Sequence, residues 1–408
     1  MKRLLGVALG ILTAIGGFVD IGDLVTNAVV GSRFGLSLVW VVAVGVIGIC
    51  LFANMSGRVA AVSGRATFEV IRERLGARAG LANLSASFLI NLLTVTAEIG
   101  GIALALQLAS GVHYLAWVPL AIGAVWFVIW RVRFKAMENV TGLVGLCLIV
   151  FAVSLFLLGP DWGDLARQAT GAVPGDEAAA TYWFYAVALF GAAMTPYEVF
   201  FFSSGAVEEK WRAKDIIQSR INVLVGFPLG GLLSVAIAAC AAVVLLPAGI
   251  GVTTLSQVAL PVAEAGGQLA LAVLILGLVA ATMGAALETT LSSGYTLAQY
   301  FGWSWGKFRA PAQASRFHVA MIVCLLVGGG ILATGVDPIL VTEYSVVFSA
   351  VALPLTYLPI LIVANDPAYM GRHVNGRLVN GLALVYLVVI LAASLAAIPL
   401  LVITGAGQ

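Results

Sequence analysis

Long apolar runs alternate with short polar connections along the 408 residues of the chain. A helix needs about 20 predominantly apolar residues to cross a bilayer. The runs that meet this requirement are 5–31, 38–57, 81–109, 114–130, 138–159, 182–206, 218–247, 268–302, 317–335, 338–364 and 378–404. The longest connection, about 160–181, has the composition of a polar surface loop, and no soluble domain fits between the runs. The pattern predicts an all-α polytopic membrane protein with about 11 transmembrane helices, forming one domain over 1–408.

Composition agrees with a membrane protein and excludes several other classes. The chain is 61% hydrophobic and 10% charged, whereas a soluble domain is about half apolar and about a quarter charged. The 21 basic and 19 acidic residues nearly balance, which argues against nucleic-acid binding. No P-loop, G-x-S-x-G or H-E-x-x-H motif occurs, so we expect neither an enzyme nor a bound cofactor. The four cysteines lie in apolar runs without metal-binding spacing, which is typical of buried thiols.

Lysine and arginine are distributed unevenly between the two ends of the predicted helices. Positive residues are enriched in cytoplasmic loops. With alternate connections assigned to one side, only Arg33 and Arg167 fall on the second side, and the other 19 of the 21 basic residues fall on the first. Lys2 and Arg3 precede an apolar run without a cleavage site, so this run is a helix rather than a signal peptide. We expect a protein of the inner or plasma membrane, with a cytoplasmic N-terminus and an extracytoplasmic C-terminus.

Acidic residues lie inside the predicted spans, unlike the basic ones. They are Asp20, Asp23, Glu98, Glu198, Glu288 and Glu343. Ionisable residues are costly in a bilayer and usually mark ion or substrate pathways. Any one of them can be a protonated, hydrogen-bonded structural group, but six acids without a basic partner need positive charge from protons, metal ions or an organic cation. The sequence therefore favours a cation transporter.

Two of these acidic positions coincide with predicted helix breaks. The first run reads GGFVDIGD over 16–23, and the sixth reads GAAMTPYE over 191–198. Glycine weakens a helix and proline removes a backbone hydrogen bond. Non-helical backbone is tolerated at membrane depth where it lines a site, and its carbonyls can coordinate a cation. A simple kink is the alternative interpretation, although each break carries acids.

The two breaks are five spans apart. Because five is odd, a second copy of a five-span unit enters the membrane from the opposite side. Paired interrupted helices in inverted repeats point to the central site of a transporter. No strong residue-level repeat links the two halves, so this inference rests on topology.

Several motifs resemble those of the Nramp (natural resistance-associated macrophage protein) family of divalent metal transporters. The segment VDIGDL at 19–24 is similar to the DPGN helix of that family, and RFGLSLVW at 33–40 to its FGY-x-LLW continuation. AEIGGIAL at 97–104 resembles AE-x-IG-x-AIAL. The segment 191–204 lines up with GA-x-x-MPHN-x-x-x-HS, and KAME at 135–138 resembles a basic-x-x-Glu entry to helix five. Together these matches run along nearly the whole chain.

The resemblance implies a LeuT-type fold of five plus five inverted helices and one extra helix, with helices one and six interrupted. The first repeat would cover about 5–159, the second about 182–364 and the extra helix about 378–404. The partners implied are the lipid bilayer and a divalent cation as substrate, without nucleic acid. A monomer is compatible with this architecture.

The family's metal ligands change chemical type in this sequence. The resemblance places them at Asp20, Asp23, the carbonyl of Ala192, and Thr195, where the family has methionine; a carboxylate also replaces the amide of DPGN at Asp23. Glu198 stands at an asparagine position beside them. Met194 is adjacent in sequence, but one residue turns a helix by about 100°. We therefore do not expect Met194 to replace the missing methionine ligand, unless the unwound segment shifts its register. Carboxylate, hydroxyl and carbonyl oxygens favour hard ions. We therefore expect Mg²⁺ or Mn²⁺, and some Nramp-related proteins without this methionine are magnesium transporters.

The residues that the family uses for proton cotransport are only partly retained. Asp20 and Glu98 remain, whereas Val95 and Tyr197 replace an acid and a histidine. A proton wire needs successive titratable or hydrated groups, so the usual route is interrupted.

Two further glutamates are candidates for a substitute route or a second cation site. Glu288 stands at a glutamine position of helix eight, and Glu343 lies about one turn before the helix-ten position of Val346. Protonated glutamates bonded to nearby backbone are an equal alternative. The predicted function is a secondary transporter, for uptake of a hard divalent cation by alternating access with weak or absent proton coupling. The alternatives are a proton-coupled Mn²⁺/Fe²⁺ transporter, a LeuT-fold carrier of an organic cation or amino acid, and a non-transporting membrane sensor.

Overall fold

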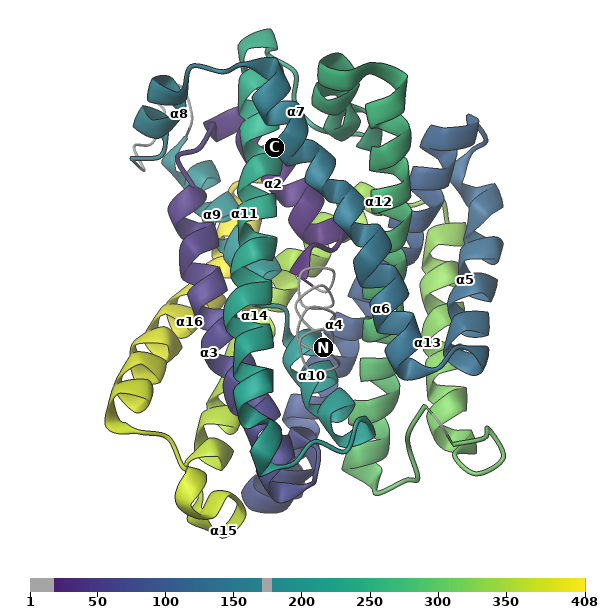
Figure 1. Ribbon diagram of the computed structural model, residues 1–408, viewed down its shortest axis with the longest axis vertical. Helices are drawn as coiled ribbons and strands as arrows, with labels where there is room; N and C mark the ends of the chain where they lie inside the picture. The colour runs from purple at the N-terminus through teal and green to yellow at the C-terminus, as the bar shows by residue number, and fades with distance from the viewer. Residues whose placement is uncertain (1–17, 171–177, 308, 408) are drawn as a thin grey trace.

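The computed structural model describes residues 18–170, 178–307 and 309–407, and all regular structure in these ranges is helical (Figure 1). The α-helices are α2 (Ile21–Phe34), α3 (Val39–Ser63), α4 (Thr67–Ser110), α5 (Tyr114–Arg131), α6 (Phe134–Gly145), α7 (Val150–Leu158), α8 (Trp162–Gln168), α9 (Ala179–Ala193), α10 (Pro196–Glu208), α11 (Ile216–Ala248), α12 (Leu255–Phe301), α13 (Ser315–Ala333), α14 (Pro338–Ala364), α15 (Pro367–Met370) and α16 (Arg377–Ile403). A 3₁₀ turn, Leu146–Ile149, joins α6 to α7 as one span.

Ten candidate membrane spans lie within the described ranges, and they match the second to eleventh predicted spans. The first predicted span, 5–31, falls partly outside the described residues, and its described part is mostly α2. The apolar pattern alone was sufficient here, because each span is a long run whose backbone groups must pair within the helix in lipid.

Two helices begin much earlier than predicted. α4 starts at Thr67 rather than at 81, and α12 starts at Leu255 rather than at 268. Each bends at a glycine in the left-handed region, Gly76 with φ 85° and Gly267 with φ 63°. Other residues rarely adopt such angles. The extra segments are therefore separate turns of helix attached to the spans, which the hydrophobic pattern could not separate from the connections.

The predicted surface loop at 160–181 also contains a short helix, α8. Asp161 begins it, because its Oδ1 accepts hydrogen bonds from the amides of Gly163 at 2.8 Å and Asp164 at 3.1 Å. The segment 160–170 is mostly exposed and polar, as predicted, and the short helix within it is an addition, since aspartate at an N-cap stabilises even a two-turn helix.

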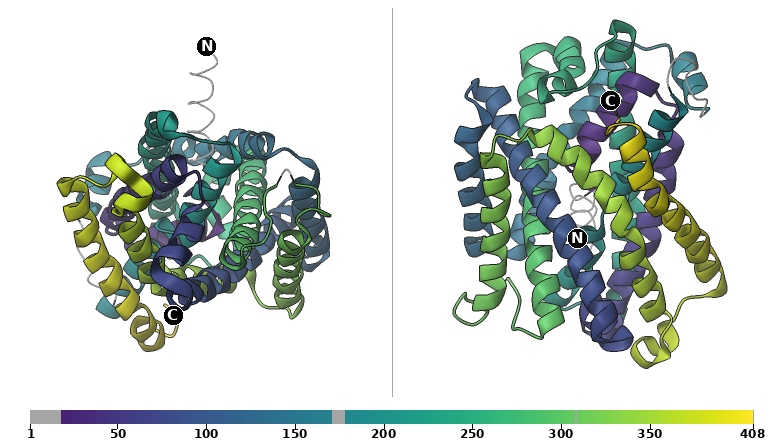
Figure 2. Two further views of the ribbon diagram at one scale, coloured as in Figure 1. Left: turned by 90° about the horizontal axis from the view of Figure 1, so that it is seen from below. Right: turned by 180° about the vertical axis from the view of Figure 1, so that it is seen from behind.

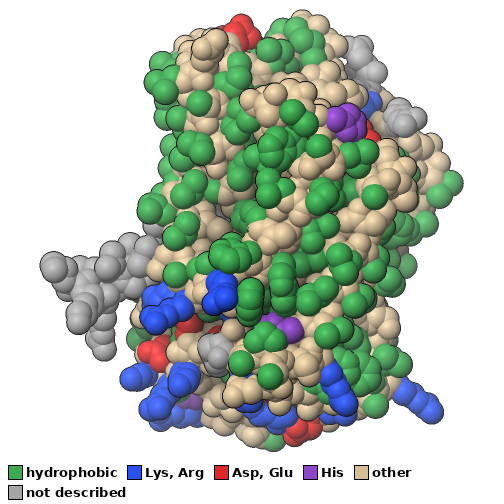
Figure 3. All heavy atoms as spheres, turned by 90° about the vertical axis from the view of Figure 1, so that its right-hand side faces the viewer, with side chains coloured by type: hydrophobic (Ala, Val, Ile, Leu, Met, Phe, Trp, Pro, Cys, Tyr) green, Lys and Arg blue, Asp and Glu red, His purple; other side chains and the backbone are tan. Residues whose placement is uncertain are grey.

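The helices form a bundle in which α4 packs along α12 and α14, and α2 packs along α11 (Figure 2). α16 lies at the edge, against α14 and α9. On the face in Figure 3, a broad apolar band covers the middle of the molecule and Lys and Arg gather at its lower end. This segregation matches the uneven distribution of basic residues in the sequence.

Candidate metal site

The first helix break lies at Val19 and Asp20. Asp20 has extended backbone angles, φ −94° and ψ −179°, and α2 begins at the next residue. The Asp20 Oδ1 accepts a hydrogen bond from the amide of Asp23 at 2.7 Å. Gly22 allows α14 to approach, because a Cβ there would lie 2.8 Å from Val346 Cγ1. The N-terminus of a half-helix, with its carboxylate cap, is thus held within the protein interior.

The second break separates α9 from α10 at Met194 and Thr195. Pro196 has no amide hydrogen, so the carbonyl of Ala192, four residues earlier, loses its helical donor. The carbonyl of Met194 instead accepts a hydrogen bond from the Tyr357 hydroxyl at 3.2 Å. A proline therefore leaves the Ala192 carbonyl available to a ligand without any further unwinding.

The two breaks meet through buried side chains. The Tyr197 hydroxyl donates to Asp20 Oδ2 at 3.2 Å, and the Thr195 hydroxyl donates to Glu198 Oε2 at 3.3 Å. Asp20 is 4% exposed and Glu198 is 5% exposed. No Lys or Arg forms an ion pair with either carboxylate in the part of the chain that the structure describes. These four residues, all singled out in the sequence, form a buried acidic centre between α2 and α10.

Asp23 is directed elsewhere. Its Oδ1 accepts from Asn27 Nδ2 at 2.9 Å, and its Oδ2 accepts from the Ser234 hydroxyl of α11 at 2.5 Å. Across the described residues, no three Asp, Glu, His or Cys side chains converge closely enough to hold a metal ion. In this conformation Asp23 therefore belongs to the contact between α2 and α11 rather than to a closed ligand shell.

The nearby thioether also faces away from the breaks. Met194 is fully buried, and its Sδ lies against α3, 2.6 Å from the position that a Cβ on Gly48 would occupy. A ring carbon of Tyr386 lies 2.8 Å from the same point. The candidate ligands at the breaks are therefore all oxygen atoms, because the Met194 sulfur packs against α3.

Two candidates for coupling or ion passage lie beside the acidic centre. Glu98 of α4 is fully buried, and its Oε1 accepts the amide hydrogen of Ile21 at 3.2 Å, so it caps the start of α2. Its other oxygen has no partner among the described residues. Glu288 of α12 is 6% exposed, and it too forms neither a hydrogen bond nor an ion pair within the described ranges. Val95, one turn before Glu98, is fully buried and apolar.

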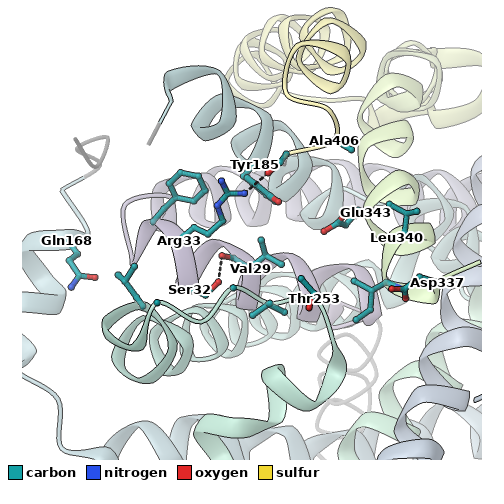
Figure 4. Close-up of a pocket in the computed structure, with 17 residues that line it drawn as sticks. Val29, Ser32, Arg33, Gln168, Tyr185, Thr253, Asp337, Leu340, Glu343 and Ala406 are labelled. Carbon is teal, nitrogen blue, oxygen red and sulfur yellow. Dashed lines mark hydrogen bonds between the residues drawn. The ribbon is translucent and has the colours of Figure 1, made fainter. Parts of the chain in front are cut away.

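Glu343 lies apart from this centre. It lines a cavity of about 910 Å³ between the end of α2 and the start of α14, together with Asp337 and Arg33 (Figure 4). Gly407, near the C-terminus, also lines the cavity, and its carbonyl accepts a hydrogen bond from Arg33. The cavity lies at the end of the molecule opposite the Lys/Arg-rich end. The Lys/Arg-rich end is predicted to be cytoplasmic, so the cavity is predicted to face outside.

Sequence reasoning missed the partners of these residues. Ser234 of α11 and Asn27 of α2 donate hydrogen bonds to Asp23, and Tyr357 of α14 donates one to the second break. Asn27 had a detectable signal, because it stands four residues after Asp23 and shares its helix face. The other two depend on which face each helix turns inward, and one sequence does not specify that.

Comparisons with known proteins agree with the geometry. The family model described as natural resistance-associated macrophage protein-like matches residues 10–399. A relative named divalent metal cation transporter MntH, from Acidiphilium cryptum, is 26% identical over 364 residues, which are 87% of this chain and 81% of that protein.

Solved structures show the same architecture. The crystal structure of the Eremococcus coleocola manganese transporter has a TM-score of 0.70 at 17% identity, covering 96% of this chain and 85% of that one. Mhp1, a nucleobase-cation-symport-1 family transporter, has a TM-score of 0.62 at 17% identity, covering 96% and 91%. At these identities the likeness shows the fold, which is the LeuT type with interrupted helices. Because the family model spans nearly the whole chain, this multi-pass membrane protein belongs to the Nramp family, a family of transporters rather than enzymes.

Proposed function

We propose that this protein carries a divalent metal cation across the membrane by alternating access, with the metal as substrate. The observation that carries the proposal is the meeting of two broken helices around buried Asp20 and Glu198, which have no ion-pair partner among the described residues. Two buried carboxylates need a positive charge. Relatives named divalent metal cation transporters support a metal ion as that charge.

The ligand chemistry favours a hard ion, Mg²⁺ or Mn²⁺. Asp20 and Glu198 would supply carboxylate oxygens, Thr195 a hydroxyl and Ala192 a carbonyl, with Asp23 joining when it leaves Ser234. Such oxygen ligands suit Mg²⁺ and Mn²⁺, whereas sulfur selects softer metals. Because Met194 packs against Gly48, the set contains no thioether. The direction proposed is uptake, through the plasma or inner membrane.

Proton coupling is proposed to be weak or absent. The Tyr197 hydroxyl contacts Asp20, but Val95 interposes an apolar side chain one turn from Glu98. Glu288 and Glu343 are then assigned to the ion route, one beside the centre and the other in the cavity near Asp337. The second candidate is a proton-coupled Mn²⁺ transporter. It is favoured by the unpartnered oxygen of Glu98 and by the likeness to a manganese transporter.

Metal uptake into proteoliposomes tests the proposal. Purified protein should accumulate Mg²⁺ or Mn²⁺, and Asp20→Ala should abolish accumulation because it removes a central carboxylate. Asp164→Ala is the matched control, since Asp164 is half-exposed on α8, far from the breaks in sequence. Absence of uptake for every divalent cation tried would reject the proposal. Equal loss in both variants would assign the effect of Asp20→Ala to general damage.

A further inference from the structure

Acidic side chains continue from the central site toward the Lys/Arg-rich end of the molecule. α6 and α12 are in close contact, because a Cβ on Gly284 would lie 3.3 Å from Thr141 Cβ. These spans are the fifth and eighth, so they run in opposite directions. Glu288 follows Gly284 by four residues, and Glu138 precedes Thr141 by three. Starting from the contact between Gly284 and Thr141, one helical turn toward the Lys/Arg-rich end leads to Glu288 on α12 and to Glu138 on α6. The two glutamates therefore lie at the same depth in the membrane.

Electrostatic contact agrees with this placement. Glu288 lies within electrostatic range of Glu198 and Asp20 of the central site and of Glu138, and these like charges repel its carboxyl. Glu138 in turn lies within electrostatic range of Glu209 and Glu208, which repel its carboxyl, and of Lys135, which attracts it. Neither Glu288 nor Glu138 forms a side-chain hydrogen bond or an ion pair within the described ranges, and Glu288 is 6% exposed. An acid that is buried, unpartnered and near other acids has a strong need for a cation.

The series ends in a cavity of about 450 Å³ at the Lys/Arg-rich end. Glu208, Glu209 and Asp215 line it, with Lys135 as the one basic side chain among the described lining residues. Lys135 Nζ is 3.7 Å from Glu209 Oε1, so it offsets one of the three carboxylates. Glu208 Oε1 accepts from the Tyr295 hydroxyl at 3.0 Å and from the amide of Lys307 at 2.6 Å. Its Oε2 is buried without a partner among the described residues, although Glu208 lines the cavity.

We propose that a divalent cation leaves the central site past Glu288 and Glu138 and departs through the cavity at Glu208 and Glu209. This inference rests on the proposed transport of a divalent cation and adds its release route. No three of the acids converge on one point in the described part of the chain, so each holds a partly hydrated ion weakly. Passage requires such positions, attractive enough to enter and weak enough to leave. Mg²⁺ in particular keeps several waters and uses one or two carboxylates at a time.

Glu138→Gln tests the route because Glu138 lies outside the central site. Removing one negative charge from a hydrated ion pathway should lower the maximal rate of Mn²⁺ uptake into proteoliposomes about fivefold. The equilibrium Kd for Mn²⁺, measured by calorimetry on the same purified full-length protein, should stay unchanged, which also shows that the variant is folded. Glu138→Asp keeps the charge and should restore most of the rate.

The matched control is Glu264→Gln, the same substitution on an exposed residue. Glu264 lies in the N-terminal part of α12, far from Glu288 along that helix. It should transport like the wild type. The route is overturned if Glu138→Gln and Glu264→Gln have equal rates. It is also overturned if Glu138→Gln weakens the Kd while the maximal rate holds, because Glu138 would then be a ligand of the central site. Absence of uptake by the wild type would instead reject the proposed function, and this inference with it.

Discussion

Thr195 is the proposed ligand whose chemistry differs most from the family pattern. Thr195→Met would place a thioether at the break, and sulfur favours softer ions. We expect Cd²⁺ to compete with Mn²⁺ uptake about tenfold more effectively in this variant, equivalent to about 1.4 kcal/mol of differential binding. Competition assays in proteoliposomes measure the ratio. Met194→Leu should leave it unchanged, because the Met194 sulfur already packs against α3. An unaltered ratio in Thr195→Met would remove Thr195 from the ligand set.

Gly48 controls the packing of that sulfur. A Cβ at this position would lie 2.6 Å from Met194 Sδ and 2.8 Å from Tyr386 Cε1, both closer than real contacts allow. Gly48→Ala should therefore destabilise the protein by about 1–3 kcal/mol, the usual cost of overpacking. Thermal unfolding in detergent measures the change. Gly123→Ala on α5 is the control, since its new Cβ would meet nothing within 4 Å. Equal melting temperatures for the two variants would contradict the tight packing.

At the scale of helices, the sequence predicted spans and breaks but not their neighbours. Apolar runs define spans because lipid permits few alternatives, and Pro196 marks the second break because it has no amide hydrogen. The helix α8 and the bends at Gly76 and Gly267 were missed, since an isolated glycine or a capping aspartate has several local outcomes. The pairing of Asp23 with Ser234 depends on tertiary packing, so no local pattern contains it.

A buried lysine, Lys307, caps the C-terminal end of α5 by donating hydrogen bonds to its last carbonyl groups. Lys307 Nζ donates to the carbonyls of Val128 at 3.1 Å and Ile129 at 2.7 Å, while its amide donates to Glu208. Burial lowers the pKa of the Lys307 ammonium to about 8, against a smaller opposing effect of Glu208. The usual value near 10.5 applies to the unfolded chain, so between these values the unfolded state binds more protons and stability rises with pH.

The corresponding measurement compares wild type with Lys307→Met between pH 7 and pH 10.5. The stability of the wild type relative to the variant should increase as pH rises from about 8, and it should be flat below that value because Lys307 is then charged in both states. A constant difference across the whole range would show that the ammonium retains its ordinary pKa in the fold.

The whole molecule offers a test of coupling. In the proposed release route, the acids of the centre, Glu288 and Glu138 form one series toward the Lys/Arg-rich end, whereas buried Val95 precedes Glu98 by one turn on α4. We expect Mn²⁺ uptake to cause little acidification inside liposomes loaded with a pH-sensitive dye. A protonophore added at the end confirms that the dye responds. Acidification that grows in proportion to Mn²⁺ uptake would establish the proton-coupled alternative.

The proline that frees the Ala192 carbonyl also bears on the kinetics of loading. Because the helix is already interrupted, an ion that binds the Ala192 carbonyl as proposed need not unfold any backbone, and we expect the loss of the ion's own water to be the slow event. Mg²⁺ dehydrates more reluctantly than Mn²⁺ and demands stricter octahedral geometry. The two ions would then differ more in rate of capture than in affinity. We therefore expect a backbone that is already interrupted to select between hard cations by the lifetime of their hydration shells.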